Sequence, residues 1–127
     1  MTNEEIIADI YQQLVNIYFT AKNVHWFSKT YGNHLLFDRI ADGLLDHVDA
    51  LIEVGLMKAT DFKALPVVTT NDKPTANEQI ALLYMQLKEL LAALDSIKTI
   101  FAEPIANELN AISQDVQIKI NLLTMVE

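Results

Sequence analysis

The sequence predicts an all-α protein in which four helices form a bundle, with one long connection in the middle. Apolar residues recur at spacings of three and four along most of the chain, which is the period of amphipathic helices. Gly and Pro number three each, too few for the many tight turns of a sandwich or barrel. The 127 residues, 51% of them hydrophobic, are enough to bury one core. We therefore expect a single domain over residues 1–127.

The first helix is expected from Thr2 to near Ser28. Thr2 and Glu5 have the spacing of a capping box. Apolar residues then follow at intervals of three and four, which predicts one buried stripe. The stripe consists of Ile7, Ile10, Leu14, Ile17, Ala21 and Val24.

The second helix is expected to run without interruption from Asn33, its N-cap, to Leu56. It follows a turn at residues 30–33, Thr-Tyr-Gly-Asn. Its apolar stripe consists of Leu36, Phe37, Ile40, Leu44, Val48 and Leu51.

A connection follows over residues 58–74, where two of the three prolines lie and where one short turn is expected at 61–65. Thr75 and Glu78 form a second capping box, opening a third helix to about Phe101. Pro104 suits the first turn of a fourth helix that runs to the C-terminus. About 17 extended residues reach some 56 Å, more than the ~36 Å of a 24-residue helix. The connection can therefore return along the whole bundle, which is the crossover of ferritin-like folds.

Composition excludes several kinds of site. The chain has no cysteine, so it holds no disulfide, thiolate zinc site, iron–sulfur cluster or cysteine nucleophile. Its net charge of -8 argues against DNA binding and favours metal cations as partners. The first residues contain neither a basic segment nor an apolar run, so no signal peptide or membrane anchor is expected. We expect a cytoplasmic protein with no membrane partner.

One face of the second predicted helix carries a histidine followed by acids. On a helical wheel these acids lie about 40° to 120° from His34, away from the apolar stripe. A solvated acidic surface is the simplest interpretation. However, four like-charge pairs one turn apart would destabilise the helix by about 1–2 kcal/mol together, and a bound cation would relieve them. Histidine and carboxylates without sulfur suit iron, manganese or zinc. The acids are Asp38, Asp42, Asp46, Asp49 and Glu53.

The spacing of these residues indicates a site shared by two chains. His34 and Asp38 lie one turn apart, as do Asp49 and Glu53. Asp38 and Asp49 are separated by about 16.5 Å along a continuous helix, so one chain cannot bring both pairs to one metal. Two antiparallel copies of the helix can, and a two-fold axis then gives two sites roughly 22 Å apart. The third and fourth predicted helices contain no histidine, which argues against a di-iron site within one chain.

Residues 25–53, HWFSKTYGNHLLFDRIADGLLDHVDALIE, resemble the central segment of the Dps proteins, or mini-ferritins. That family has His-Trp at the end of the first helix, then His-x3-Asp, then Asp-His-x-Asp-x3-Glu. The likeness covers the whole chain in architecture but is specific only over residues 25–53. The interval from His25 to His34 is about three residues shorter than in the family, and no Lys-rich tail precedes the first helix. The matching residues are His25, Trp26, His34, Asp38, Asp46, His47, Asp49 and Glu53.

The resemblance implies a ferroxidase centre between subunits. His25, His34 and Asp38 would come from one subunit, and Asp49 and Glu53 from its two-fold partner. It further implies a hollow homododecamer that oxidises Fe(II), preferably with hydrogen peroxide rather than oxygen, and stores ferric iron, which protects against oxidative damage. One or two irons would bind at each centre, and zinc could substitute.

Two other functions remain open: a non-catalytic metal site that serves assembly, and a metal-free four-helix interaction protein. Trp26 fits either core packing or a place beside the iron. We interpret His47 as a satisfied, partly buried histidine. Asp42 and Asp46 fit groups that guide iron, although Asp46 fits solvated surface better. Three further acids could line an entry pore but fit ordinary surface better: Glu103, Glu108 and Asp115. The residues expected in the core are Tyr18, Met57, Met85 and Met125.

Overall fold

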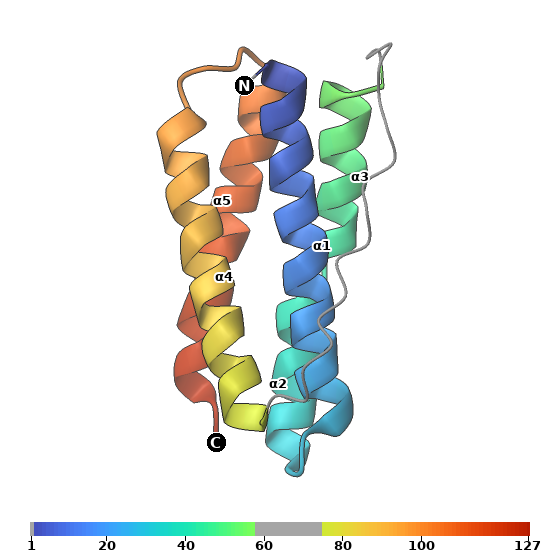
Figure 1. Ribbon diagram of the computed structural model, residues 1–127, viewed down its shortest axis with the longest axis vertical. Helices are drawn as coiled ribbons and strands as arrows, with labels where there is room; N and C mark the ends of the chain where they lie inside the picture. The colour runs from blue at the N-terminus through green and yellow to red at the C-terminus, as the bar shows by residue number, and fades with distance from the viewer. Residues whose placement is uncertain (1, 58–74) are drawn as a thin grey trace.

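The structure is a computed structural model that describes residues 2–57 and 75–127. Five α-helices and a final 3₁₀ turn occupy these residues, and no β-strand occurs among them. Helices α2 and α3 follow one another along one line, so the helices form four rods (Figure 1). The all-α prediction is therefore confirmed for the described residues. The elements are α1 (Asn3–Phe27), α2 (Tyr31–Ala41), α3 (Leu44–Gly55), α4 (Ala76–Ile97), α5 (Ile105–Leu122) and the turn Leu123–Met125.

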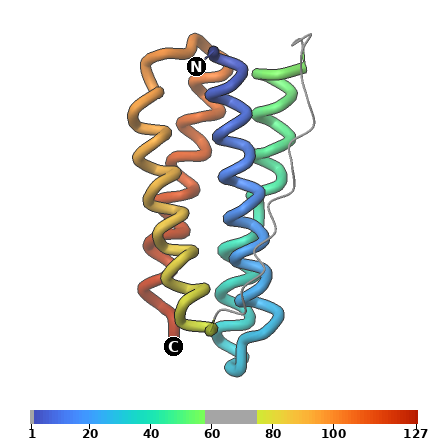
Figure 2. The backbone as a smooth tube through the Cα atoms, in the orientation of Figure 1, coloured from blue at the N-terminus to red at the C-terminus, as the bar shows by residue number. Residues whose placement is uncertain are grey.

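The rods do not simply alternate in direction. Helix α1 runs downward in Figure 1 and the α2–α3 rod returns upward, whereas α4 begins at the lower end and also runs upward. Helix α5 then descends beside α4, as the backbone tube of Figure 2 also shows. The α2–α3 rod and α4 are thus parallel. The expected crossover and its short turn fall on residues 58–74, outside the described residues.

Threonine side chains cap three of the helices. Thr2 Oγ1 accepts from the backbone N–H of Glu5 and Thr75 Oγ1 from that of Glu78, both at 3.1 Å. These two predicted caps are confirmed. The prediction of Asn33 as the cap of the next helix is wrong, because Thr30 accepts the Asn33 N–H and α2 begins at Tyr31.

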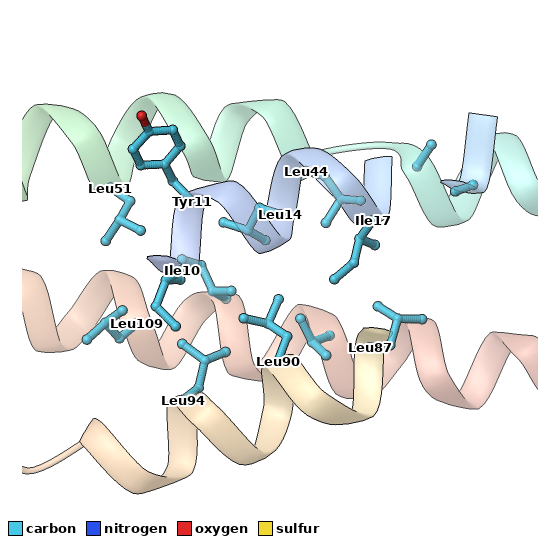
Figure 3. Close-up of a cluster of buried hydrophobic side chains, with 14 of the residues drawn as sticks. Ile10, Tyr11, Leu14, Ile17, Leu44, Leu51, Leu87, Leu90, Leu94 and Leu109 are labelled. Atoms are coloured by element: carbon cyan, nitrogen blue, oxygen red, sulfur yellow. The ribbon is translucent and has the colours of Figure 1, made fainter. Parts of the chain in front are cut away.

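The core lies along the axis of the bundle (Figure 3). All six predicted stripe residues of α1 are buried, and leucines of α4 meet them from the opposite side. Four of the six stripe residues predicted for the second helix are also buried, while Leu36 and Val48 are half-buried. The prediction that three methionines belong to the core is wrong. The three are 58% to 71% exposed: Met57, Met85 and Met125. Met57 follows the end of α3 and Met125 ends the 3₁₀ turn, while Met85 lies off the buried stripe of α4.

The prediction of an uninterrupted second helix is also wrong. Helix α2 ends at Ala41 and α3 starts at Leu44. Between them Gly43 has φ 81° and ψ −13°, a left-handed conformation that L residues with a Cβ rarely adopt. The wheel angles and axial distances calculated across this break therefore do not apply.

The last two helices are slightly shorter than expected. Helix α4 ends at Ile97 rather than near Phe101, and Pro104 is the N-cap of α5 rather than a residue of its first turn. Among the described residues, no helix is long and apolar enough to cross a membrane.

Candidate metal centre

The two histidines at the junction of α1 and α2 hold each other in place. His25 Nδ1 lies 2.6 Å from the carbonyl oxygen of His34, and His34 Nδ1 lies 2.8 Å from that of His25. The rings stack, with centroids 4.0 Å apart and an interplanar angle of 24°. Because a carbonyl oxygen only accepts, both Nδ1 atoms carry hydrogen and donate. Each neutral ring then keeps its lone pair on Nε2, which is the arrangement of many metal-binding histidines.

Asp38 lies beside this pair and is bound by a lysine. Lys22 Nζ donates to Asp38 Oδ1 at 2.7 Å, and His25 Nε2 lies 3.9 Å from the same oxygen. The hydrogen bond from Lys22 lowers the pKa of Asp38 below its ordinary value, and the same bond raises the pKa of Lys22. Asp38 is therefore ionised at neutral pH and faces two imidazoles. The structure thus brings together three of the five predicted site residues.

The other two predicted site residues are not part of this group. Asp49 and Glu53 lie on α3, beyond the break, and both are exposed. Within residues 2–57 and 75–127 of a single chain, no three His, Asp or Glu side chains are arranged to hold a metal ion. The predicted centre is accordingly divided between α1–α2 and α3.

A hollow of about 240 Å³ opens beside Asp38, where α1 passes the break. The Lys22–Asp38 ion pair and the acids Asp42 and Asp46 border it, and both acids are exposed. The hollow therefore leaves water and ions access to this side of the break. Its lining consists of Tyr18, Lys22, Asp38, Ala41, Asp42, Gly43, Leu45 and Asp46.

Three exposed large apolar residues lie about one helical turn along the sequence from Lys22 or Asp38. Trp26 follows Lys22 by four residues on α1 and is 54% exposed. The interpretation of Trp26 as a core residue is therefore wrong. Phe19 precedes Lys22 by three residues, and Leu35 precedes Asp38 by three, so each shares its partner's helix face. Both are about half exposed. Because Phe19 and Trp26 share the face of α1 that carries Lys22, this face is a candidate for contact with a second chain.

A second polar group lies on the other side of the break, between α3 and α5. His47 is partly buried, and both ring nitrogens have partners: Glu108 Oε1 at 3.1 Å and Asp115 Oδ2 at 3.0 Å. This agrees with its interpretation as a satisfied histidine. Neither Glu108 nor Asp115 is free surface, contrary to the preferred sequence interpretation, because each is engaged by His47. Glu103 is exposed.

Sequence reasoning missed the two lysines of these groups. Lys22 has no sequence signal beyond its place three residues before His25. Lys119 does have one, because it continues the buried positions Leu109, Ile112 and Val116 at intervals of three and four. A lysine on an apolar stripe indicates a buried charge with a specific partner.

Comparison of the chain with protein-family models, with curated proteins and with solved structures finds no match. The functional interpretation therefore depends on the residues and geometry described above.

Proposed function

We propose that the chain is a Dps-like mini-ferritin that oxidises Fe(II) at centres shared between two subunits and stores the ferric product. The observation that carries the proposal is the His25–His34 pair. Its reciprocal hydrogen bonds leave both Nε2 lone pairs available, next to the ionised Asp38. Imidazoles held in place beside a carboxylate supply the nitrogen and oxygen donors that iron, manganese and zinc use, and a second chain would have to complete the site.

The donor set favours iron over softer metals. Imidazole nitrogen and carboxylate oxygen suit Fe(II), Mn(II) and Zn(II), and no sulfur ligand is available because the chain lacks cysteine. Carboxylates also offset the added charge as Fe(II) becomes Fe(III). With peroxide as oxidant, two Fe(II) each give one electron to H₂O₂, which takes up two protons and becomes two waters. One or two irons per centre, or zinc in their place, are compatible with these donors.

Because one chain does not complete the site, we propose that two chains share each centre. Asp49 and Glu53 are exposed on α3, and Phe19, Trp26 and Leu35, about one helical turn from Lys22 or Asp38, are exposed as well. A two-fold partner on this face would bury the apolar residues and supply its own Asp49 and Glu53. Assembly of such dimers into a closed homododecamer rests on the family resemblance.

The direction of the rods supports a ferritin-like bundle. Parallel α2–α3 and α4 (Figure 1) are the arrangement found in bundles with one long crossover. We further propose that the protein is cytoplasmic and protects the cell from iron and peroxide, without binding DNA or membranes.

One contact favours the alternative that the bundle binds metal without redox chemistry, or binds none. Lys22 already neutralises Asp38, so no cation is needed there to balance the charge of the carboxylate. A metal that binds Asp38 has to share the carboxylate with Lys22 or displace the Lys22 hydrogen bond from Oδ1. The same surface would then serve assembly alone, with or without a redox-inert ion such as zinc.

Anaerobic Fe(II) titration followed by a pulse of peroxide tests the proposal. We expect saturable Fe(II) binding, rapid growth of ferric ultraviolet absorbance and two Fe(II) consumed per peroxide. Asp38→Asn should weaken both binding and oxidation. Asp95→Asn is the matched control, because Asp95 is an exposed aspartate that is also paired with a lysine, on α4. Zn(II) binding without Fe(II) oxidation would favour the assembly site, and absence of both would exclude the metal centre.

Light scattering and ultracentrifugation test the shared site separately. We expect at least a dimer at micromolar concentration, and a particle of twelve chains if the cage forms. A stable monomer that still oxidises Fe(II) at a saturable site would contradict the two-chain centre.

A further inference from the structure

Lys119 is a buried charge that the proposed metal chemistry does not use. Lys119 is 4% exposed, and Thr20 is the only other buried polar residue in the described ranges. Lys119 Nζ donates to the backbone carbonyl oxygen of Asp42 at 2.8 Å and lies 3.2 Å from Asp115 Oδ1. The side chain therefore reaches from α5 to the break between α2 and α3.

The position of Lys119 on its helix makes this contact unexpected on packing grounds. Lys119 follows Leu109, Ile112 and Val116 on the buried stripe of α5, where an aliphatic residue would pack without the cost of removing a charge from water. An aliphatic residue could not donate a hydrogen bond, whereas Lys119 donates to the Asp42 carbonyl at the C-terminal end of α2. In an unbroken helix the Asp42 carbonyl would accept the N–H four residues later.

A chain of polar contacts extends from Lys119 to the first turn of α3. Asp115 binds Lys119 through Oδ1 and His47 Nε2 through Oδ2, and His47 Nδ1 contacts Glu108. The α2 end of the break is thus fixed through Asp42 and the α3 end through His47. Both are fixed to the same helix, α5.

The break separates the two pairs of proposed ligands. His34 and Asp38 lie on α2, whereas Asp49 and Glu53 lie on α3, so the dihedral angles at residues 42 and 43 set their relative positions. In a two-fold dimer that relation decides whether one chain's pair reaches the other's. We propose that Lys119 is a positioning residue that, by holding the broken conformation, brings the two ligand pairs into register across the dimer. This inference rests on the proposed metal centre.

The natural absence of cysteine allows a direct measurement of the break. Arg39→Cys and Val54→Cys place nitroxide labels on exposed positions of α2 and α3. Labelled chains diluted into excess unlabelled chain give the distance within one chain by pulsed electron resonance. We expect one narrow distance distribution in the parent, and a shifted or broadened one after Lys119→Met. This substitution keeps an unbranched side chain only one atom shorter, but removes its charge and its donors.

Metal binding measures the consequence at the centre. Co(II), a spectroscopic substitute for Fe(II), should bind Lys119→Met roughly tenfold more weakly, the usual lower range for loss of a supporting group. Lys98→Met removes an exposed lysine on the C-terminal side of α4 and should change neither distance nor affinity. If Lys119→Met does not fold, Asp115→Asn tests the same network, because it keeps the shape and removes one charge. Asp115→Asn should change the label distance and weaken Co(II) binding in the same direction as Lys119→Met, but by less.

The results separate the two proposals. An unchanged distance distribution in a folded Lys119→Met chain would overturn the role of Lys119 at the break. A changed distribution with unchanged Co(II) affinity would overturn its role in ligand register. Absence of Co(II) binding in the parent chain would contradict the metal centre, while the distance measurement would still decide whether Lys119 holds the break.

Discussion

Lys22 and Asp38 are 16 residues apart in the sequence, and their charged groups meet at 2.7 Å between α1 and α2. The ammonium group engages Oδ1, one of the two oxygens of the carboxylate that the proposed centre needs. Lys22 is thus an internal competitor of any metal that binds Asp38. Its presence should make the affinity of the centre depend on ionic strength.

Lys22→Met should therefore tighten Co(II) binding several-fold, because it removes both the competing hydrogen bond and the repulsion between ammonium and metal ion. Stability should fall by no more than about 1 kcal/mol, since the Asp38 side chain is half exposed and surface ion pairs contribute little. Isothermal titration and urea unfolding measure the two effects. Lys98→Met is again the control, and weaker binding by Lys22→Met would contradict competition.

The His25–His34 pair should behave as one unit in unfolding experiments. Either His→Ala substitution removes one of the two reciprocal hydrogen bonds and the ring stacking as well. Each single substitution is expected to cost about 1 kcal/mol for its bond, and the double mutant should cost less than the sum. Urea unfolding of the parent, the two single mutants and the double mutant gives the coupling energy, which we expect at the lower end of the usual range, about 0.5–1 kcal/mol. Additive losses would show that the two contacts are energetically independent.

Mixing two inactive variants tests whether the centre is shared. His34→Ala damages the α2 part of a centre and Asp49→Asn the α3 part. A dimer with one chain of each kind has one doubly damaged centre and one intact centre. Ferroxidase activity should therefore recover partly when the variants are unfolded and reassembled together. Lack of recovery in particles shown by mass spectrometry to be mixed would mean that each chain builds its own centre.

DNA should not bind at physiological salt. With a net charge of -8, the protein gains little from the counterion release that drives contact with phosphates. Plasmid should migrate unchanged in a gel at neutral pH in the presence of a chelator. Retardation under these conditions would contradict the prediction, whereas retardation only with added Mg²⁺ would indicate bridging by cations.

The helices could be predicted from sequence because their signals are local. The spacing of apolar residues defined the stripe of α1, and Thr2 and Thr75 each cap a helix within three residues of their own position. Asn33 was the wrong choice although Asn is on average the better capping residue, because Thr also caps helices and Thr30 lies only three residues earlier. Apolar spacing does not distinguish the two positions.

The break at Gly43 could not be predicted in the same way. A glycine inside a helical pattern costs only about 1 kcal/mol relative to alanine, so it does not by itself end a helix. The buried partner of the Asp42 carbonyl is Lys119, 77 residues away in the sequence, and such a tertiary contact has no local signal. The His25–His34 bonds also depend on how two helices meet. The sequence therefore identified the three grouped site residues but not what orients them.

The break also changes the electrostatics of the acidic face. One long helix would have carried an unbroken series of like charges, whereas the break places the positive end of a helix macrodipole in the middle of the bundle, at the start of α3. Asp46 lies in that first turn, where a negative charge is stabilised by about 0.3–1 kcal/mol. The peptide groups of α3 thus offset part of the repulsion between the acidic side chains, which a bound cation would otherwise have to offset.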